Sequence, residues 1–175
     1  MVLLHICCAP CATACVERLR EDGYKVTGYF YNPNIQPLEE YEKRYREVIK
    51  LSELMVFELH AGNYDSLRWF EEIKGLEDEP EGGRRCEVCY RLRLEETAAL
   101  AKKLGIGQFT TTLSVSPHKC FDKIRLIGEK LAQSYKLVFL PYDFKKKDGF
   151  KRSVELSRKY NLYRQNYCGC VFSKD

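Results

Sequence analysis

The stretch of sequence that decides the fold is Val2-Leu3-Leu4-His5-Ile6-Cys7-Cys8-Ala9-Pro10-Cys11. Its first half is a short apolar run, which is typical of a buried strand. Its second half consists of thiols, a proline and small residues, which suit a loop that leads into a helix. In an open α/β sheet, ligands bind in the loops at the carboxyl ends of the strands. This loop carries cysteines where a phosphate-binding protein would carry glycines, so it indicates metal or redox chemistry.

Strands and helices alternate along the rest of the chain. The predicted strands cover residues 2–6, 25–31, 55–59, 108–112 and 137–140, and the predicted helices cover 10–21, 39–54, 65–73, 84–104, 118–134 and 150–160. This alternation predicts right-handed βαβ units, and therefore a parallel sheet with helices on both faces. We expect a single Rossmann-like α/β domain over residues 1–175, in which the segment from about 141 to 175 carries a basic region and a cysteine pair.

The composition restricts how the cysteines can be interpreted. The chain of 175 residues is long enough to form a core without disulfide bonds. It has no apolar run of about 18 residues and no leader pattern, so we expect no membrane span and a cytoplasmic protein. In a reducing compartment, nine cysteines are more typical of metal ligands and catalytic thiols than of a disulfide framework.

The positive charge is unevenly distributed. The net charge is only +4, but residues 119–175 contain 14 Lys and Arg residues against 6 Asp and Glu residues. A basic final third is what a polyanion-binding face requires. On charge alone, a solvated surface that is rich in lysine is the preferred explanation.

Two groups of cysteines could share one centre. Cys86 and Cys89 are three residues apart at the start of the long predicted helix, so they project from the same face. The helix dipole favours thiolates there. With Cys7 and Cys8 they give four thiolates, the set used by both structural zinc and iron–sulfur clusters. An extended backbone directs neighbouring side chains to opposite sides, so the adjacency of Cys7 and Cys8 favours the larger iron–sulfur cluster over one small ion.

The remaining cysteines have other predicted roles. Cys11 is spare beside this set, and could bind a second metal or face the substrate. Cys15 and Cys120 are expected to be small buried core residues. In the sequence Cys168-Gly169-Cys170, the glycine lets the backbone close the tight ring of a C-x-C disulfide. Such a ring is strained and easily reduced, which favours a redox-active pair, although two further metal ligands are the alternative.

Five ordered blocks of sequence carry a family resemblance. They are Leu4–Cys11, Arg85–Leu94, Phe109–Leu113 with Ser116-Pro117, Asp143–Lys146 and Leu162–Cys170. Together they resemble the cobalamin-independent epoxyqueuosine reductase family, QueH, nearly from end to end. The resemblance implies a HUP-type α/β fold and the reduction of the epoxide of epoxyqueuosine in tRNA to the alkene of queuosine. This reaction takes up two electrons and two protons and releases water, so it requires an external electron donor.

The resemblance also implies cofactors and site residues. It implies a [4Fe–4S] cluster on Cys7, Cys8, Cys86 and Cys89, and a redox-active pair formed by Cys168 and Cys170. Cys11 is our candidate ligand for a second, mononuclear metal that would act as a Lewis acid on the epoxide oxygen. Asp143 would complete that site or donate a proton, or is simply a turn residue before the lysine run.

The implied partner is the anticodon arm of tRNA. Basic residues late in the chain would contact phosphates, and Tyr163, Tyr167 or Phe150 would stack on an unpaired base. One rival interpretation is an ATP-dependent tRNA thiolation enzyme of the same fold, which needs a Ser/Gly-rich loop after the first strand. Another is a zinc-stabilised tRNA-binding module, which leaves Cys168 and Cys170 without a role. We favour the reductase.

Overall fold

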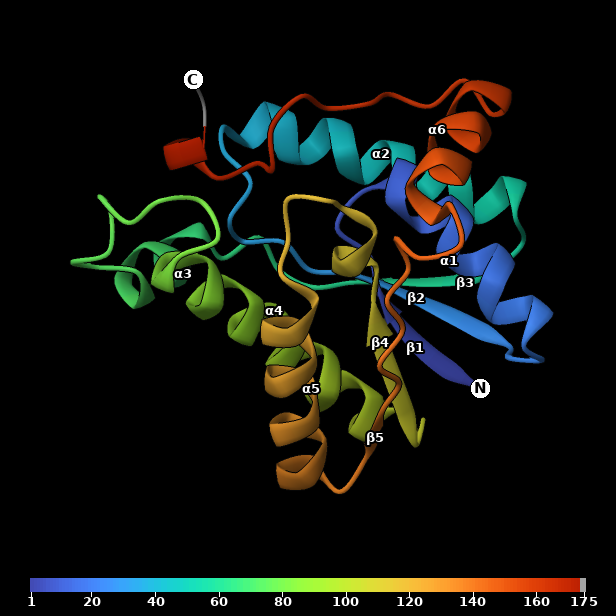
Figure 1. Cartoon of the computed structure of the whole chain (residues 1–175), viewed down its shortest axis with the longest axis horizontal. Helices are drawn as coiled ribbons and strands as arrows, with labels where there is room; N and C mark the ends of the chain where they lie inside the picture. The colour runs from blue at the N-terminus through green and yellow to red at the C-terminus, as the bar shows by residue number, and fades with distance from the viewer. Residues whose placement is uncertain (174–175) are drawn as a thin grey trace.

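The computed structural model describes residues 1–173 and contains one parallel five-stranded sheet (Figure 1). Its strands are β1 (Val2–His5), β2 (Val26–Phe30), β3 (Glu58–Ala61), β4 (Gln108–Thr111) and β5 (Val138–Phe139). They lie in the order β3-β2-β1-β4-β5, and every neighbouring pair is parallel. The predicted α/β class with a parallel sheet is confirmed, and β1 is the central strand.

Six α-helices flank the sheet. They are α1 (Ala9–Glu21), α2 (Leu38–Leu54), α3 (Ser66–Glu72), α4 (Arg84–Lys103), α5 (Phe121–Tyr135) and α6 (Gly149–Lys159). Successive residues of β1 serve two cores, because side chains alternate across a strand. Leu4 belongs to an apolar cluster with residues of α1 and α2, and Leu3 to one with residues of α4 and α5. Within residues 1–173, no helix is both long enough and apolar enough to cross a membrane.

Two predicted boundaries are wrong for local reasons. The third strand begins at Glu58 and not at Met55, because Met55 caps α2 and Val56 adopts a left-handed backbone conformation with φ 52°. The fifth helix begins at Phe121 and not near His118, because residues 116–119 form a hydrogen-bonded turn.

The predictions for the two outlying cysteines have opposite outcomes. Cys15 is completely buried in the core beside β1, as predicted. Cys120 is exposed, so the prediction of a buried residue is wrong. Its position explains the difference, because Cys120 is the N-cap residue of α5 and lies outside the packed face of that helix.

The strand order places a switch point beside β1. From β1 the chain proceeds to β2 and β3 on one side and then crosses to β4 on the other, so the loops after β1 and β4 diverge. Buried His5 ties these strand ends together: Nδ1 lies 2.8 Å from the Thr111 hydroxyl and Nε2 lies 3.1 Å from the Tyr31 carbonyl oxygen. Burial lowers the pKa of His5 to about 4, so this imidazole is neutral at physiological pH.

The packing of α5 on β5 generates a stability prediction. A Cβ at Gly128 would lie 2.6 Å from ring atoms of Phe139. We expect Gly128→Ala to lower the free energy of unfolding by roughly 1–2 kcal/mol through overpacking, although alanine in a helix ordinarily adds about 1 kcal/mol. Urea denaturation measures the change. Adding Phe139→Leu to Gly128→Ala should recover the lost free energy of unfolding. A Gly128→Ala protein more stable than the wild type would contradict this account of the contact.

Candidate functional site

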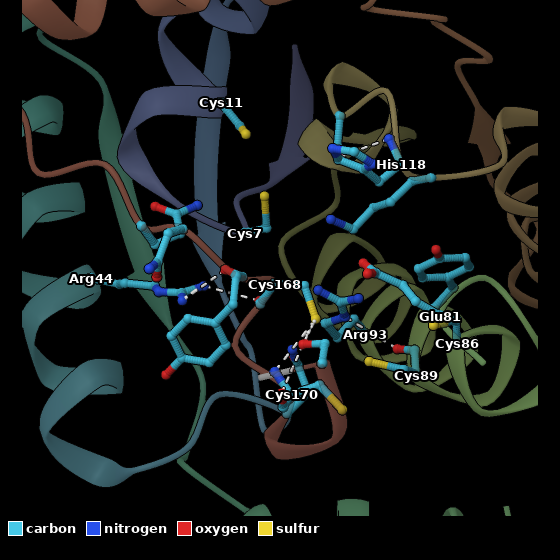
Figure 2. Close-up of a pocket in the computed structure, with 18 of the residues that line it drawn as sticks. Cys7, Cys11, Arg44, Glu81, Cys86, Cys89, Arg93, His118, Cys168 and Cys170 are labelled. Atoms are coloured by element: carbon cyan, nitrogen blue, oxygen red, sulfur yellow. Dashed lines mark hydrogen bonds between the residues drawn. The ribbon is translucent and has the colours of Figure 1, made fainter. Parts of the chain in front are cut away.

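A cavity of about 380 Å³ lies at the carboxyl edge of the sheet. Its walls come from the loops after β1, β2 and β4, the first turns of α4, and the C-terminal segment. Figure 2 shows thiols and cationic side chains around it. The lining cysteines are Cys7, Cys11, Cys86, Cys89, Cys168 and Cys170. The structure therefore brings six of the nine cysteines together, from segments far apart in the sequence.

Cys7, Cys8 and Cys11 form a compact group of thiols at the end of β1. Their Sγ atoms all lie within 4.8 Å of one another, and those of Cys7 and Cys8 are 3.8 Å apart. Thiolates around a tetrahedral ion with metal–sulfur bonds of about 2.3 Å are about 3.8 Å apart. The adjacency of Cys7 and Cys8 therefore does not disfavour a small ion, contrary to our expectation, because the chain bends between Cys7 and the N-cap residue Cys8 and no longer alternates like a strand.

The electrostatics of this group favour one negative charge on Cys7. A hydrogen bond from Cys11 and a smaller effect of one from Cys8 hold the pKa of the Cys7 thiol well below its usual range, although burial opposes them. The Thr112 hydroxyl also donates to Cys7 Sγ at 3.1 Å. Donation to Cys7 raises the pKa of Cys11 well above its ordinary value. For Cys8, the hydrogen bond with Cys11 lowers the pKa. The hydrogen bond with Cys7 and burial together raise it by more, so the pKa of Cys8 is about 11.

Cys86 and Cys89 contribute a separate wall of the cavity at the start of α4. Cys86 is half-buried, and its Sγ accepts the Gly82 N–H at 3.2 Å. Cys89 is buried in an apolar cluster that includes Trp69 and Cys170, and this burial raises the pKa of its thiol. Among residues 1–173, the only metal-sized group of three ligands is the one at the end of β1. Of the four predicted cluster ligands, Cys7, Cys86 and Cys89 line the cavity, whereas Cys8 is buried and does not.

The Cys168-Gly169-Cys170 loop forms a third wall of the cavity. Both cysteines are free thiols, and Gly169 has φ +110°, with no room for a Cβ, which would lie 2.8 Å from Ile35. A hydrogen bond from Cys170 is the main cause that lowers the pKa of Cys168 to about 4; the charge of Lys119 and the Ser173 hydroxyl act in the same direction. The pKa of Cys170 is raised, because its thiol donates this bond. The pair is thus one thiolate beside one thiol.

Arg44 anchors this loop, and the sequence analysis did not single it out. Its guanidinium, only 2% exposed, donates to Glu40 at 2.7 Å, to the Cys168 carbonyl at 3.0 Å and to the Tyr167 carbonyl at 3.2 Å. The available signal was its place on α2, three residues after Tyr41 and four before Val48, both of which are buried. An arginine on the buried stripe of a helix indicates a buried polar partner.

Two further cations face the thiols. The Arg93 guanidinium is buried and donates through Nε to the Cys89 carbonyl at 3.2 Å, and Lys119 is partly buried in the loop after β4. Neither forms a salt bridge with a carboxylate in the described part of the chain. Burial lowers the pKa of each side chain. The negative charge of ionised Cys89 raises the pKa of Arg93, and that of Cys7 raises the pKa of Lys119, and in both cases the net shift is upward. The cavity is therefore suited to an anionic centre.

Asp143 lies elsewhere. Its side chain does not line the cavity, and it is not a member of the thiol group at the end of β1. Its carboxylate oxygens lie 3.9 Å from the ammonium of Lys145 and 4.0 Å from that of Lys146, and its backbone carbonyl accepts a bond from Arg18. This arrangement resembles the turn aspartate that was the simpler of its two predicted roles.

The whole chain resembles one family of enzymes. The family model described as epoxyqueuosine reductase QueH matches residues 2–175. The epoxyqueuosine reductase QueH of Thermotoga maritima is 40% identical over 98% of this chain and 89% of its own length. The protein of the same name from Streptococcus pyogenes is 40% identical over 98% of this chain and 69% of its own length.

A solved structure supports the fold alone. It is the crystal structure of a predicted subunit of tRNA methyltransferase from Methanocaldococcus jannaschii, with a TM-score of 0.55 and 13% sequence identity. The similarity covers 91% of this chain and 76% of that chain.

The Arg44 contacts generate a prediction about stability. Arg44→Met leaves the Glu40 carboxylate, 12% exposed, without its cation. We expect a loss of about 3 kcal/mol in the free energy of unfolding, measured by urea denaturation, and faster hydrogen exchange of the 165–173 backbone. The double variant with Glu40→Gln should lose less. A change within about 0.5 kcal/mol for Arg44→Met would show that the anchor is dispensable.

The Cys168 thiolate generates a prediction about pH. Only the thiolate reacts with iodoacetamide, so alkylation of Cys168 in the metal-free protein should persist below neutral pH and decline through about pH 4. Cys170→Ala removes the donor and should shift this midpoint upward. Mass spectrometry of the peptide that contains Cys168 measures the extent, with exposed Cys120 as the internal reference. A wild-type midpoint near the ordinary value of about 8.5 would contradict the assigned thiolate.

Proposed function

Because the chain belongs to the epoxyqueuosine reductase QueH family, we propose that it is an oxidoreductase that reduces the epoxide of epoxyqueuosine in tRNA to the alkene of queuosine. The observation that carries this proposal is the convergence of six thiols on one cavity at the carboxyl edge of the sheet. Thiols serve both as reductants and as ligands of redox metals.

The proposed reductant in contact with the substrate is the pair formed by Cys168 and Cys170. With Cys168 as a thiolate and Cys170 as a thiol, oxidation to a disulfide releases two electrons and one proton. An epoxide that becomes an alkene takes up two electrons and two protons, and its oxygen leaves as water, so the two half-reactions balance when the solvent supplies the second proton. The thiolate character of Cys168 and the protonated state of Cys170 support this assignment. An external electron donor then reduces the disulfide for the next turnover.

The proposed cofactor is a [4Fe–4S] cluster held by Cys7, Cys8, Cys86 and Cys89. The donor set fits, because four thiols without disulfide partners lie on or directly behind two walls of one cavity. Arg93 and Lys119 fit as well, since they would offset the charge of the ligated thiolates. When bound, such a cluster supplies electrons one at a time. Cys11 would be a ligand of a second, mononuclear metal, because its Sγ lies within 4.8 Å of those of Cys7 and Cys8.

The proposed partner is the anticodon arm of tRNA, bound over α6 and the cavity mouth. Exposed cations in this region would contact phosphates: Lys146, Lys147, Lys151, Arg158 and Lys159. Phe150 is 40% exposed, lines the cavity and lies under the Arg164 guanidinium, which suits it to stacking on a base. Arg152 is a weaker candidate, because it already pairs with Glu17 at 2.8 Å. Affinity for tRNA should fall steeply as salt increases.

One observation favours a second candidate function, a zinc-stabilised tRNA-binding module. The 3.8 Å separation of the Cys7 and Cys8 sulfurs suits a zinc ion without rearrangement. In that case the protein would bind tRNA without reducing the epoxide, and Cys168 and Cys170 would be dispensable.

The test is a reduction assay under strict anaerobiosis. Protein reconstituted with iron and sulfide is incubated with dithionite and an anticodon stem–loop that contains epoxyqueuosine, and the nucleosides are resolved by mass spectrometry. We expect conversion to queuosine, and a loss of about 100-fold or more in rate for Cys168→Ser and for Cys170→Ser.

Cys15→Ser is the matched control, since Cys15 is buried outside the cavity. It should retain the rate if it folds. Protein that contains only zinc and does not convert the epoxide, but still binds the stem–loop, would replace the reductase with the binding module.

A further inference from the structure

Buried polar atoms without hydrogen-bond partners are concentrated at the cavity. Within residues 1–173, six side chains carry such an atom, and four of them line the cavity: Asn34, Trp69, Arg85 and Gln165. A buried polar atom without a partner is destabilising, and most proteins contain few of them. Because these four side chains line the same cavity, they indicate a ligand that supplies the missing hydrogen-bond partners.

The protein supplies a partner for the Trp69 atom and binds the rest of the Arg85 guanidinium. The Trp69 indole N–H interacts with the Cys89 sulfur. The Arg85 guanidinium donates through Nη1 to the carbonyls of Leu76 at 3.2 Å and Glu77 at 2.7 Å, so only its Nε lacks a partner. The remaining two atoms are both acceptors, Oδ1 of Asn34 and Oε1 of Gln165.

Asn34 is held rigidly in this position. It is 1% exposed, and its Oδ1 has no hydrogen-bond partner among the described residues. The loop around it is fixed on three sides. Its neighbour Asn32 donates to the Ile6 carbonyl at 2.9 Å, the Ile35 carbonyl accepts from Tyr64 at 2.7 Å, and the Gln36 N–H donates to the Gly169 carbonyl at 2.8 Å. A fixed carboxamide without a partner is preorganised for a ligand.

The chemistry of the cavity defines what this ligand must carry. Two carboxamide oxygens require hydroxyl or amine donors, whereas Arg93 and Lys119 require an electron-rich oxygen or an anion. An epoxide oxygen only accepts hydrogen bonds, so it cannot satisfy Oδ1 of Asn34 or Oε1 of Gln165. The donors must come from hydroxyl or amine groups that flank the epoxide on the modified base.

We propose that Asn34, assisted by Gln165, binds the hydroxyl and amine donors beside the epoxide and so selects the modified base over guanine. This inference rests on the proposed function and deepens it. A site built around buried hydrogen-bonding groups strongly rejects a ligand that lacks the matching groups, because its own polar atoms then stay unpaired.

The test measures binding and stability, not turnover. Fluorescence anisotropy gives the affinity of each variant for two anticodon stem–loops, one with epoxyqueuosine and one with guanine at the same position. For Asn34→Leu we expect the ratio of the two affinities to fall by about tenfold or more, through weaker binding of the modified RNA alone. The thermal midpoint of the free protein should stay the same or rise, since an apolar side chain replaces an unpaired amide.

Asn32→Leu is the matched control. Asn32 is equally buried, but it does not line the cavity, its amide N–H₂ group bonds to Ile6, and its carboxamide interacts with His5. This variant should lower the thermal midpoint and keep the affinity ratio. Gln165→Met changes a partly buried segment and should by itself lower the ratio of the two affinities. This variant tests the proposal if Asn34→Leu does not fold.

Wild-type ratios in both Asn34→Leu and Gln165→Met would overturn the inference. So would a lower thermal midpoint for Asn34→Leu with an unchanged ratio, which would make Asn34 structural. Failure of the proposed function is a distinct outcome, in which the wild-type protein neither prefers nor reduces the modified RNA.

Discussion

The site depends on the hydrogen bonds of one buried guanidinium. Arg44 of α2 holds the carbonyls of Tyr167 and Cys168 while it pairs with Glu40. A charge that is removed from water must have all its donors satisfied, so the chain end and α2 are ordered together. This contact brings the C-terminal thiols over the carboxyl edge of the sheet. Without the hydrogen bonds of Arg44, the loop of Cys168 and Cys170 would not be held as the third wall of the cavity. The thiols after β1 and at the start of α4 would then face solvent.

The sheet order supplies the other constraint. With β1 between β2 and β4, its carboxyl end is the place where neighbouring connections diverge, and the cavity at this edge is lined by Cys7. Arg93 and Lys119 then place positive charge within this cavity. A centre of thiolates and a negatively charged RNA both favour such surroundings, and Asn34 adds a fixed acceptor for neutral donors. In the proposed function, three groups of residues have separate tasks, which are to hold the redox centre, supply electrons and select the base.

The sequence predicted the features that depend on local pattern. Alternating apolar periods gave the α/β class, and the spacing of Cys86 and Cys89 gave a pair of thiols on one side of a helix. Features that depend on distant contacts were missed. Nothing local indicates that Arg44 bonds to a carbonyl 124 residues away. The bend between Cys7 and Cys8 was also invisible, because the prediction extended the geometry of a strand one residue too far.

A single turnover in which the thiols are counted tests whether Cys168 and Cys170 supply the electrons. Protein reduced with dithionite, and freed of excess reductant, is mixed anaerobically with an equimolar stem–loop that contains epoxyqueuosine, then quenched in acid and alkylated. The account predicts that each queuosine formed is accompanied by one disulfide between Cys168 and Cys170. Formation of queuosine while both thiols stay free to be alkylated, with no other source of electrons replenished, would contradict it.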